Sequence, residues 1–308
     1  MKRISEIIEK AKTLGRRRLA VASAQEAAVL EAVADAYREG IAEPILVGDP
    51  GAIARAAAEA NKGSGVDISS FRIVEEPSLA GAAARAVALV RSGEAEFLMK
   101  GIIDTSLLLR VALNKETGLN AGRLASHVAV IEVPTYHKLL IVTDAALNIA
   151  PDLSAFVDII DSAVAVANAL EVKTPKVALL AAVEKVNPEK MPCTVTASVL
   201  TQMNRRGQIK NCIVDGPLAL DNAISAESAR IKKIQSDVAG DADILVVPDI
   251  EAGNILYKCL LDLAGAKGAA VIMGASVPMV LTSRADSAET KLASIALASL
   301  LGDKGLRA

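Results

Sequence analysis

Residues 19–47 read LAVASAQEAAVLEAVADAYREGIAEPILV, in which two short apolar runs flank a longer amphipathic run. The apolar runs, residues 19–23 and 44–47, lack strict polar alternation, which is typical of strands buried on both faces. The run between them, residues 26–37, spaces its apolar residues as a helix does. A strand, a helix and a second strand in this order predict a mostly parallel sheet covered by helices, and hence the α/β class.

The same alternation recurs along the chain. Further strands are predicted at residues 71–74, 96–100, 176–182, 211–214, 243–247, 269–273 and 278–281. Further helices are predicted at residues 53–60, 79–91, 156–170, 195–203, 252–263 and 288–301. A chain of 308 residues with this many elements suits one large or two medium α/β domains.

The middle of the chain departs from the alternation. Residues 127–133 and 139–144 are both strand-like, and the sequence PTYHK between them is typical of a hairpin with a longer loop. An antiparallel element inside a parallel pattern is a natural place for a domain change. We therefore expect two α/β lobes with a cleft, the first formed by residues 1–138 with 286–308 and the second by residues 139–285.

The composition excludes several classes of protein. A formal net charge of −2 with interspersed acidic and basic residues predicts no nucleic-acid partner. The N-terminal sequence MKRISEIIEKAK lacks the apolar core of a signal peptide, and the longest weakly polar stretch, 268–283, is shorter than a membrane span of roughly 20 residues. Three widely spaced cysteines fit a reducing compartment. We expect a cytoplasmic protein that does not associate with membranes.

Common catalytic motifs are absent from the sequence. It contains no GxGxxG after a strand, no GxxxxGK[ST] and no GxSxG. The only histidines are His127 and His137, and no cysteine or histidine cluster accompanies them, so we expect no metal site. A Ser/His/Asp triad stays open, because such a triad is recognised by geometry rather than by sequence order.

One loop that follows a predicted strand has the features of an anion site. Lys100 ends the strand and supplies a positive charge, and Gly101 permits close approach of the backbone. Thr105 or Ser106 is predicted to cap the next helix, whose N-terminus favours anions. The alternative is that Asp104 or Thr105 only caps the helix and that Lys100 is solvated.

Two other loops carry polar residues at strand ends. The first, RLASH, places a guanidinium, a hydroxyl and an imidazole within five residues: Arg123, Ser126 and His127. The second, PDIEAGN, leads into a predicted helix and offers Asp249, Gly253 and Asn254. We predict ligand contacts from both loops, although Asp249 can equally act as a helix cap and a histidine at a strand edge is usually structural.

A fourth loop, LTSRADS, ends an apolar run with hydroxyls, an arginine and an aspartate. Arg284 can bind phosphate oxygens with two hydrogen bonds, and Ser283 can donate to a phosphate or to a developing oxyanion. In the alternative interpretation, Asp286 or Ser287 caps the helix from residue 288 and Arg284 pairs with Asp286. The capping and the anion-binding interpretations are compatible, since a capped helix N-terminus is also an anion site.

Seven segments together resemble the phosphate acetyl/butyryltransferase family. They occur in the family's order and span nearly the whole chain: MKGIIDTS (99–106), RLASHVAV (123–130), TDAALNIAPD (143–152), VEKVNPEKMPCT (183–194), DGPLALDNA (215–223), GDADILVVPDIEAGNILYK (240–258) and LTSRADSAETKLASIA (281–296). The compact length, RLASH and SRADSAETK are closer to the butyryl branch than to the acetyl branch.

The resemblance implies an isocitrate/isopropylmalate dehydrogenase-like fold, with two α/β/α lobes assembled as a homodimer. It implies reversible conversion of acyl-CoA and phosphate into acyl phosphate and coenzyme A, without a tightly bound cofactor or a covalent enzyme intermediate. The Ser-Arg pair of the family matches Ser283 and Arg284. The acetyl branch carries a catalytic aspartate seven positions after this serine, where the present chain has Thr290. Asp286 or His127 therefore remains the candidate proton acceptor.

Other classes of function stay open at this point. Within the family, acetyl-CoA competes with butyryl-CoA as the acyl donor. A decarboxylating dehydrogenase would share the fold, but we find no convincing set of paired aspartates for a divalent ion. A non-catalytic protein that binds coenzyme A or phosphate is the remaining alternative.

Overall fold

A computed structural model describes residues 1–63, 65–283 and 286–303. The chain forms two compact units: unit 1 comprises Met1–Ile4 and Leu124–Gly268, and unit 2 comprises Ser5–Arg123 and Ala269–Ala308. Both divisions lie earlier in the chain than the expected boundaries after residues 138 and 285. Both strands of the central hairpin belong to unit 1, and β11, which follows residue 268, pairs with β4 of unit 2.

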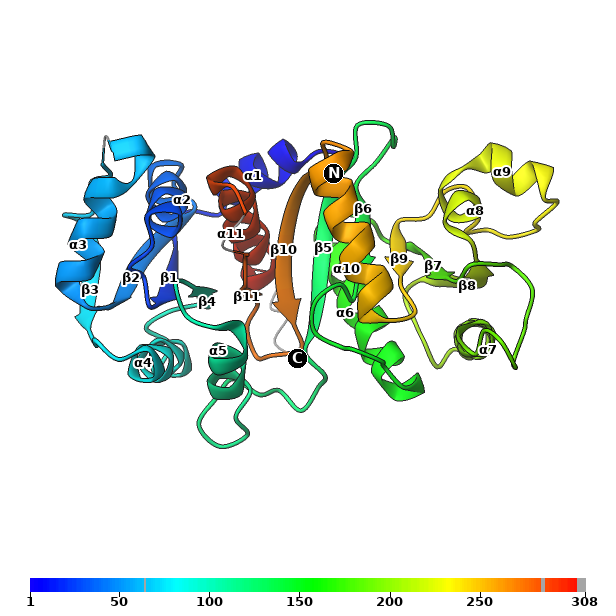
Figure 1. Ribbon diagram of the computed structural model, residues 1–308, viewed down its shortest axis with the longest axis horizontal. Coiled ribbons are helices and arrows are strands. Elements are labelled where there is room, and N and C mark those ends of the chain that lie inside the picture. The colour runs from blue at the N-terminus through cyan, green and yellow to red at the C-terminus, as the bar shows by residue number, and fades with distance from the viewer. Residues whose placement is uncertain (64, 284–285, 304–308) are drawn as a thin grey trace. The chain divides into compact units, whose positions relative to one another are not determined.

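Unit 2 contains a sheet in the order β3-β2-β1-β4-β11-β10 (Figure 1). Its strands are β1 (Arg17–Ala22), β2 (Ala42–Gly48), β3 (Arg72–Glu75), β4 (Phe97–Lys100), β10 (Lys267–Met273) and β11 (Met279–Val280). Its helices are α1 (Ile4–Lys12), α2 (Ala27–Arg38), α3 (Pro50–Glu59), α4 (Leu79–Arg91), α5 (Thr105–Ala112) and α11 (Ala288–Asp303), with a 3₁₀ turn at Asn61–Gly63. The strands β3, β2, β1, β4 and β11 pair in parallel, as predicted, and β10 is antiparallel to β11.

Unit 1 contains strands in the order β5-β6-β9-β7-β8. They are β5 (Ser126–Glu132), β6 (Leu140–Thr143), β7 (Lys176–Leu180), β8 (Ile213–Leu218) and β9 (Ile244–Val246). The helices are α6 (Leu153–Ala169), α7 (Cys193–Arg205), α8 (Leu220–Ile224), α9 (Ala226–Ile231) and α10 (Ile250–Lys258), which continues as a π-helical turn, Cys259–Leu263. β5 and β6 form the predicted antiparallel hairpin, and the other strands pair in parallel.

The predicted α/β class is confirmed, and most differences concern element ends. α6 begins at Leu153 rather than at residue 156, because Asp152 caps it by accepting the N–H of Ala155 at 2.8 Å. The strand predicted at 211–214 extends to Leu218 through Gly216 and Pro217, residues that usually end a strand. The helices α1, α8 and α9 were not predicted from the sequence.

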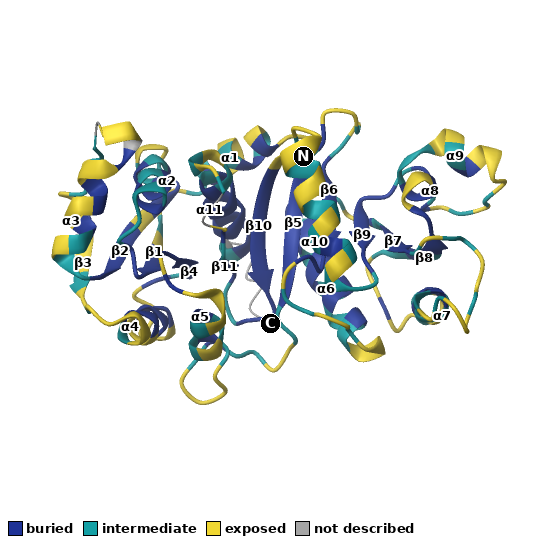
Figure 2. Cartoon of the chain, in the orientation of Figure 1, coloured by how far each residue is buried: buried dark blue, intermediate teal, exposed yellow. Residues whose placement is uncertain are grey.

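The strands form the core of each unit (Figure 2). All residues of β4, β6 and β9 are buried, as expected of strands covered on both faces. In the described parts of the chain, no helix combines the length and the apolar character needed to cross a membrane.

Strand direction brings the predicted site loops to one edge of each sheet. In unit 2, Ala22 of β1 pairs with Lys100 of β4 and Val280 of β11 pairs with Met99 of β4, so the loops that follow these strands are neighbours. In unit 1, β5 runs against β6, so the start of β5 lies beside the end of β6. The carboxyl ends of parallel strands are where α/β folds bind ligands.

Candidate functional site

The turn after β11 is closed by its own backbone and by Asp286. The N–H of Ser283 donates to Oδ2 of Asp286 at 2.7 Å, and the N–H of Asp286 donates to the carbonyl of Ser283 at 3.2 Å. Ser287 caps α11, since its Oγ accepts the N–H of Thr290 at 3.1 Å. Of the two predicted caps, Ser287 therefore has this role and Asp286 closes the turn. Arg284 lies outside the described residues.

Lys291 on α11 holds the same turn, and the sequence did not single it out. It is only 1% exposed, and its Nζ donates to the carbonyls of Ser283 at 3.1 Å and Asp286 at 2.5 Å. Burial lowers the pKa of Lys291, while the charges of Asp286 and Glu26 act in the opposite direction. A lysine within a helical pattern is ordinarily solvated. The contacts of Lys291 with the two carbonyls of the turn are therefore apparent only from the folded structure.

Lys100 is buried at the end of β4 rather than solvated. Its Nζ donates to the carbonyls of Gly101 and Ile103, both at 3.2 Å, and so fixes the loop that follows. Of the capping residues considered for the next helix, Asp104 rather than Thr105 or Ser106 occupies the N-cap position, because α5 begins at Thr105. Thr105 is exposed in the first turn of α5.

The loop after β1 brings unpartnered polar atoms to the same edge of unit 2. Ser23 is fully buried with φ of 57°, and Oγ of Ser23 and Oε1 of Gln25 have no hydrogen-bond partner among the described residues. The carbonyl of Ser23 accepts the N–H of Ile102 at 2.9 Å. A side chain at Gly101 would collide with this carbonyl, which explains the glycine. Sequence reasoning missed Ser23 and Gln25, since neither residue type marks a site.

In unit 1, the start of β5 is tied to the turn after β6. The N–H of His127 donates to Oδ2 of Asp144 at 3.1 Å, and Oγ1 of Thr143 donates to the carbonyl of His127 at 2.8 Å. Nδ2 of Asn148 also donates to Oδ2 of Asp144, at 2.6 Å. The imidazole of His127 is 5% exposed and packs edge-on against Tyr257, with 5.6 Å between ring centroids. Asp144 and Asn148 belong to the segment TDAALNIAPD, but neither was singled out.

The RLASH loop spans the division between the two units. Arg123 is exposed and is the last residue of this part of unit 2. Ser126 begins β5 and is fully buried, and its Oγ has no hydrogen-bond partner among the described residues. A buried hydroxyl without a partner is costly, so Ser126 is a candidate to donate to a bound ligand.

The start of α10 packs against the Asp144 turn. Asp249 caps α10, since its Oδ1 accepts a backbone N–H in the first turn at 2.8 Å. Gly253 is buried, and a Cβ there would collide with the carbonyl of Asp144. Nδ2 of Asn254 donates to the carbonyl of Ala145 at 3.2 Å. The predicted cap is thus confirmed for Asp249. Through Gly253 and Asn254, the start of α10 contacts the turn that contains Asp144.

An apolar pocket of about 190 Å³ lies near the carboxyl ends of β7 and β9 in unit 1. Helices α6 and α7 supply much of its wall, and the end of the 144–151 segment completes it. Its lining includes Pro151, Phe156, Leu180, Ala197, Leu200 and Val247. The lining is predominantly apolar, so this pocket suits a hydrocarbon group rather than an anion.

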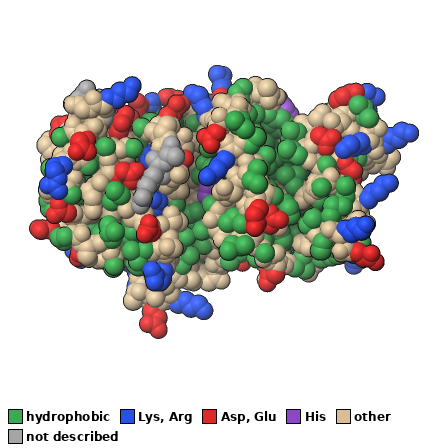
Figure 3. All heavy atoms as spheres, viewed as in Figure 1, with side chains coloured by type: hydrophobic (Ala, Val, Ile, Leu, Met, Phe, Trp, Pro, Cys, Tyr) green, Lys and Arg blue, Asp and Glu red, His purple; other side chains and the backbone are tan. Residues whose placement is uncertain are grey.

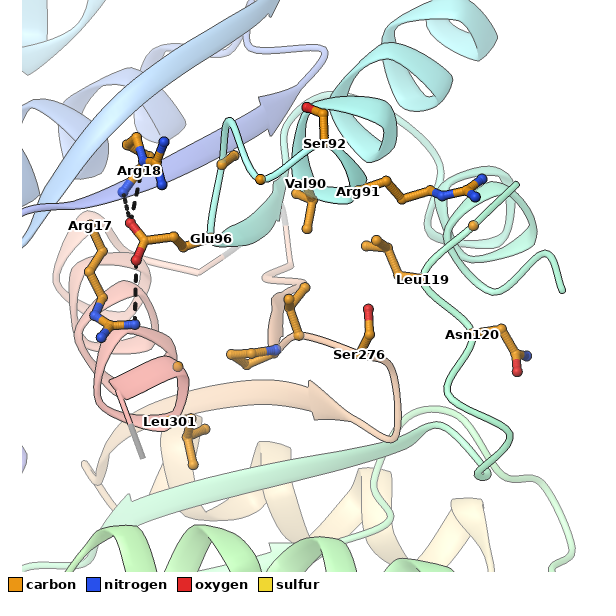
Figure 4. Close-up of a pocket in the computed structure, with 16 residues that line it drawn as sticks. Arg17, Arg18, Val90, Arg91, Ser92, Glu96, Leu119, Asn120, Ser276 and Leu301 are labelled. Carbon is orange, nitrogen blue, oxygen red and sulfur yellow. Dashed lines mark hydrogen bonds and ion pairs between the residues drawn. The ribbon is translucent and has the colours of Figure 1, made fainter. Parts of the chain in front are cut away.

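A cavity of about 610 Å³ in unit 2 lies at the opposite, amino-terminal edge of the strands. Figure 4 shows Arg17 and Arg18 directed toward Glu96, with nitrogen–oxygen distances of 3.7 and 3.5 Å. Since Glu96 offsets part of this positive charge and the predicted loops lie at the other edge, we do not place the reaction here. Within the described residues, no group of three or more metal-ligating side chains gathers.

Comparisons with known proteins identify the family of the chain. Residues 69–299 match the family model described as phosphate acetyl/butaryl transferase. The chain is 48% identical over 301 residues to the phosphate butyryltransferase of Clostridium acetobutylicum, with 98% of each chain covered. It is also 48% identical over 297 residues to the phosphate acetyltransferase of Thermotoga maritima, covering 96% of this chain and 99% of the relative.

A solved structure gives the same result. The branched-chain phosphotransacylase from Enterococcus faecalis V583 is 36% identical, covers 93% of this chain and 99% of its own, and superposes with a TM-score of 0.81. The family model spans most of the chain, and these relatives match over nearly their whole length. The chain therefore belongs to the phosphate acetyl/butaryl transferase family.

Proposed function

We propose that the protein transfers a short acyl group reversibly between coenzyme A and phosphate, with butyryl-CoA or a similar acyl-CoA as donor. The observation that carries this proposal is the turn at Ser283 and Asp286. The buried ammonium of Lys291 holds this turn, and the turn lies next to the loop fixed by Lys100. Positive charge and polar donors at the carboxyl ends of parallel strands suit an anionic substrate.

We assign the phosphate contacts to unit 2. Arg284 binds the phosphate oxygens, with Lys100, Arg123 and Thr105 as further contacts. Ser283 donates to the oxyanion that forms as the acyl carbon becomes tetrahedral. The exposure of Ser283 and the fixed turn behind it support this assignment.

We assign contacts with coenzyme A to unit 1, through Ser126 and the start of α10 at Asp249, Gly253 and Asn254. The proton acceptor is Asp286 or His127. Asp286 accepts the N–H of Ser283 with Oδ2, which supports Asp286, whereas His127 is buried. The two candidates are separated by replacing each in turn.

The reaction balances without a cofactor. In the direction of acyl-CoA synthesis, the thiol of coenzyme A loses its proton to the acceptor and its sulfur attacks the acyl carbon. The carbon–oxygen bond to phosphate then breaks, and phosphate leaves. A thiol pKa of about 8.5 makes the acceptor useful near neutral pH. Holding both substrates in line lowers the barrier by several kcal/mol on its own.

We place the acyl chain in the apolar pocket of unit 1. A volume of about 190 Å³ accommodates a few carbon atoms but not a long chain. Each buried methylene contributes about 0.8 kcal/mol, so the two additional methylenes of butyryl relative to acetyl favour butyryl-CoA by about 1.6 kcal/mol, or roughly 15-fold. Acetyl-CoA remains the second candidate donor, because one close relative is a phosphate acetyltransferase.

The finer structural expectations are also part of the proposal. We propose that the two units are the two lobes of an isocitrate dehydrogenase-like fold and that the protein is a cytoplasmic homodimer. Coenzyme A acts as a substrate and not as a resident cofactor. On the face shown in Figure 3, acidic and basic side chains are interspersed, which supports small-molecule partners rather than nucleic acid.

The proposal is tested by incubating the purified protein with acetyl-, propionyl-, butyryl- and valeryl-CoA, with and without phosphate. Release of free thiol is followed. Phosphate-dependent release is expected, fastest with butyryl-CoA. A protein that binds coenzyme A without releasing thiol would be a binding protein, and thiol release without phosphate would indicate a hydrolase.

A further inference from the structure

We propose that Lys291 binds the substrate phosphate directly, through the one ammonium N–H for which the described residues provide no acceptor. This inference rests on the proposed function and adds a phosphate-binding residue to it. An ammonium group has three N–H donors. Two of them are directed to the carbonyls of Ser283 at 3.1 Å and Asp286 at 2.5 Å.

The charge of Lys291 is not neutralised by an ion pair with any described residue. The charges of Asp286 and Glu26 act to raise the pKa of its ammonium, although neither carboxylate forms an ion pair with Lys291 among the described residues. The carboxylate of Asp286 instead accepts the N–H of Ser283 at 2.7 Å. Lysine is rarely this buried unless it is paired, because an isolated buried charge is expensive.

The surroundings of Lys291 favour an anion as the missing partner. The residue lies in the first turn of α11, where the backbone N–H groups of a helix also attract anions. In the loop after β1, Ser23 is fully buried, and its Oγ has no hydrogen-bond partner among the described residues. A buried hydroxyl donor after β1 and a buried ammonium beside the turn after β11 together suit phosphate oxygens, since both strands pair with β4.

Two substitutions separate phosphate binding from support of the turn. Lys291→Gln keeps two N–H donors for the two carbonyls but removes the third donor and the charge. Lys291→Met keeps the apolar stem and removes all donors. The matched control is Lys173→Gln, which changes an exposed lysine in unit 1.

Steady-state kinetics of thiol release provide the first readout. Both Lys291 variants are expected to raise the KM for phosphate roughly 10- to 100-fold, the value of one hydrogen bond to a charged group. The KM for butyryl-CoA should change by no more than about twofold. A Lys291→Gln enzyme with normal phosphate KM would overturn the proposal, and if Lys291→Met alone were impaired, the role of the lysine would be to hold the turn.

A thermal shift by inorganic phosphate provides a second readout that does not need activity. Phosphate should raise the melting temperature of the wild-type protein and of Lys173→Gln, since a ligand that binds only the folded state stabilises it. It should have little effect on either Lys291 variant, and an unchanged shift in both would overturn the proposal. If the wild-type protein itself released no thiol with phosphate, the proposed function would fail instead, so the two failures are distinguishable.

Discussion

The backbone N–H of His127 donates a hydrogen bond to the buried carboxylate of Asp144 at 3.1 Å. The same carboxylate accepts the N–H groups of Ala146 and Leu147, both at 2.9 Å, and Nδ2 of Asn148 at 2.6 Å. One side chain thereby joins the start of β5 to the turn after β6. The position of His127 in unit 1 depends on this carboxylate.

Replacing Asp144 with alanine should therefore damage both stability and activity. The buried N–H of His127 and three partly buried donors lose their acceptor. A buried unsatisfied group costs about 1–3 kcal/mol, so we expect a loss of about 2 kcal/mol in unfolding free energy. Urea unfolding and thiol-release rates measure the two effects. Asp152→Ala, which removes the cap of α6, is the control and should cost about 1 kcal/mol while leaving the rate close to wild type. Equal unfolding curves for Asp144→Ala and wild type would contradict this role.

Removing the guanidinium of Arg284 should abolish phosphate-dependent thiol release without unfolding the protein. Loss of a bidentate contact to a charged group predicts a decrease in kcat/KM for phosphate of about 100-fold or more. Circular dichroism melting verifies the fold of Arg284→Ala. Arg55→Ala, which changes an exposed arginine on α3, should behave like wild type. A rate near wild type in Arg284→Ala would remove this residue from the site.

Filling the apolar pocket should alter the choice of acyl group. Ala197→Phe places a ring in the pocket, so the preference of roughly 15-fold for butyryl-CoA over acetyl-CoA should largely disappear. The measurement is kcat/KM for each acyl-CoA at saturating phosphate. Val199→Phe changes a partly exposed residue on the same helix and should preserve the preference. If Ala197→Phe lowered both values equally, the pocket would not hold the acyl chain.

A cluster at the amino end of β9 should make stability depend on pH in the acid range. Burial acts to raise the pKa of Asp241, but hydrogen bonds from Lys176 and Lys138 outweigh it and hold this pKa well below 3.8. A lowered carboxyl pKa stabilises the folded state above the unfolded-state pKa, and the contribution is lost as the pH falls below it.

Asp241→Asn should consequently be less stable than wild type at pH 7, by about 1 kcal/mol because the group is partly exposed. The difference in unfolding free energy between Asp241→Asn and wild type should decrease as the pH falls below about 4. Urea unfolding at several pH values measures it, with Asp237→Asn, at an exposed aspartate, as control. A gap that stayed constant down to pH 3 would show that the ion pairs do not stabilise the fold.

The sequence predicted the elements well because strands and helices have different apolar periods. The helix predicted at residues 79–91 has the same bounds as α4. The antiparallel hairpin was predicted from two apolar runs and the five-residue loop between them. The short helices α8 and α9 were missed, since five or six residues do not establish a period. The divisions between the units lie earlier in the chain than the expected boundaries, and the whole antiparallel hairpin belongs to unit 1.

Among the predicted site loops the sequence identified one helix cap, whereas it did not single out several buried side chains that hold the turns. Asp249 was named as a helix cap from its place before an amphipathic run, and the structure confirms it. Lys291, Ser23 and Asp144 could not be found in this way, since their importance comes from carbonyls and N–H groups that only the fold places around them. In a single sequence, a lysine on a helix or an aspartate after a strand cannot be distinguished from a solvated surface residue.

The central claim is that phosphate is the acyl acceptor, and phosphorus NMR of the reaction mixture tests it most directly. Wild-type protein with butyryl-CoA and inorganic phosphate should produce an acyl phosphate signal that grows in step with free thiol. The same sample without protein is the control. Thiol release with an unchanged inorganic phosphate signal would contradict the account.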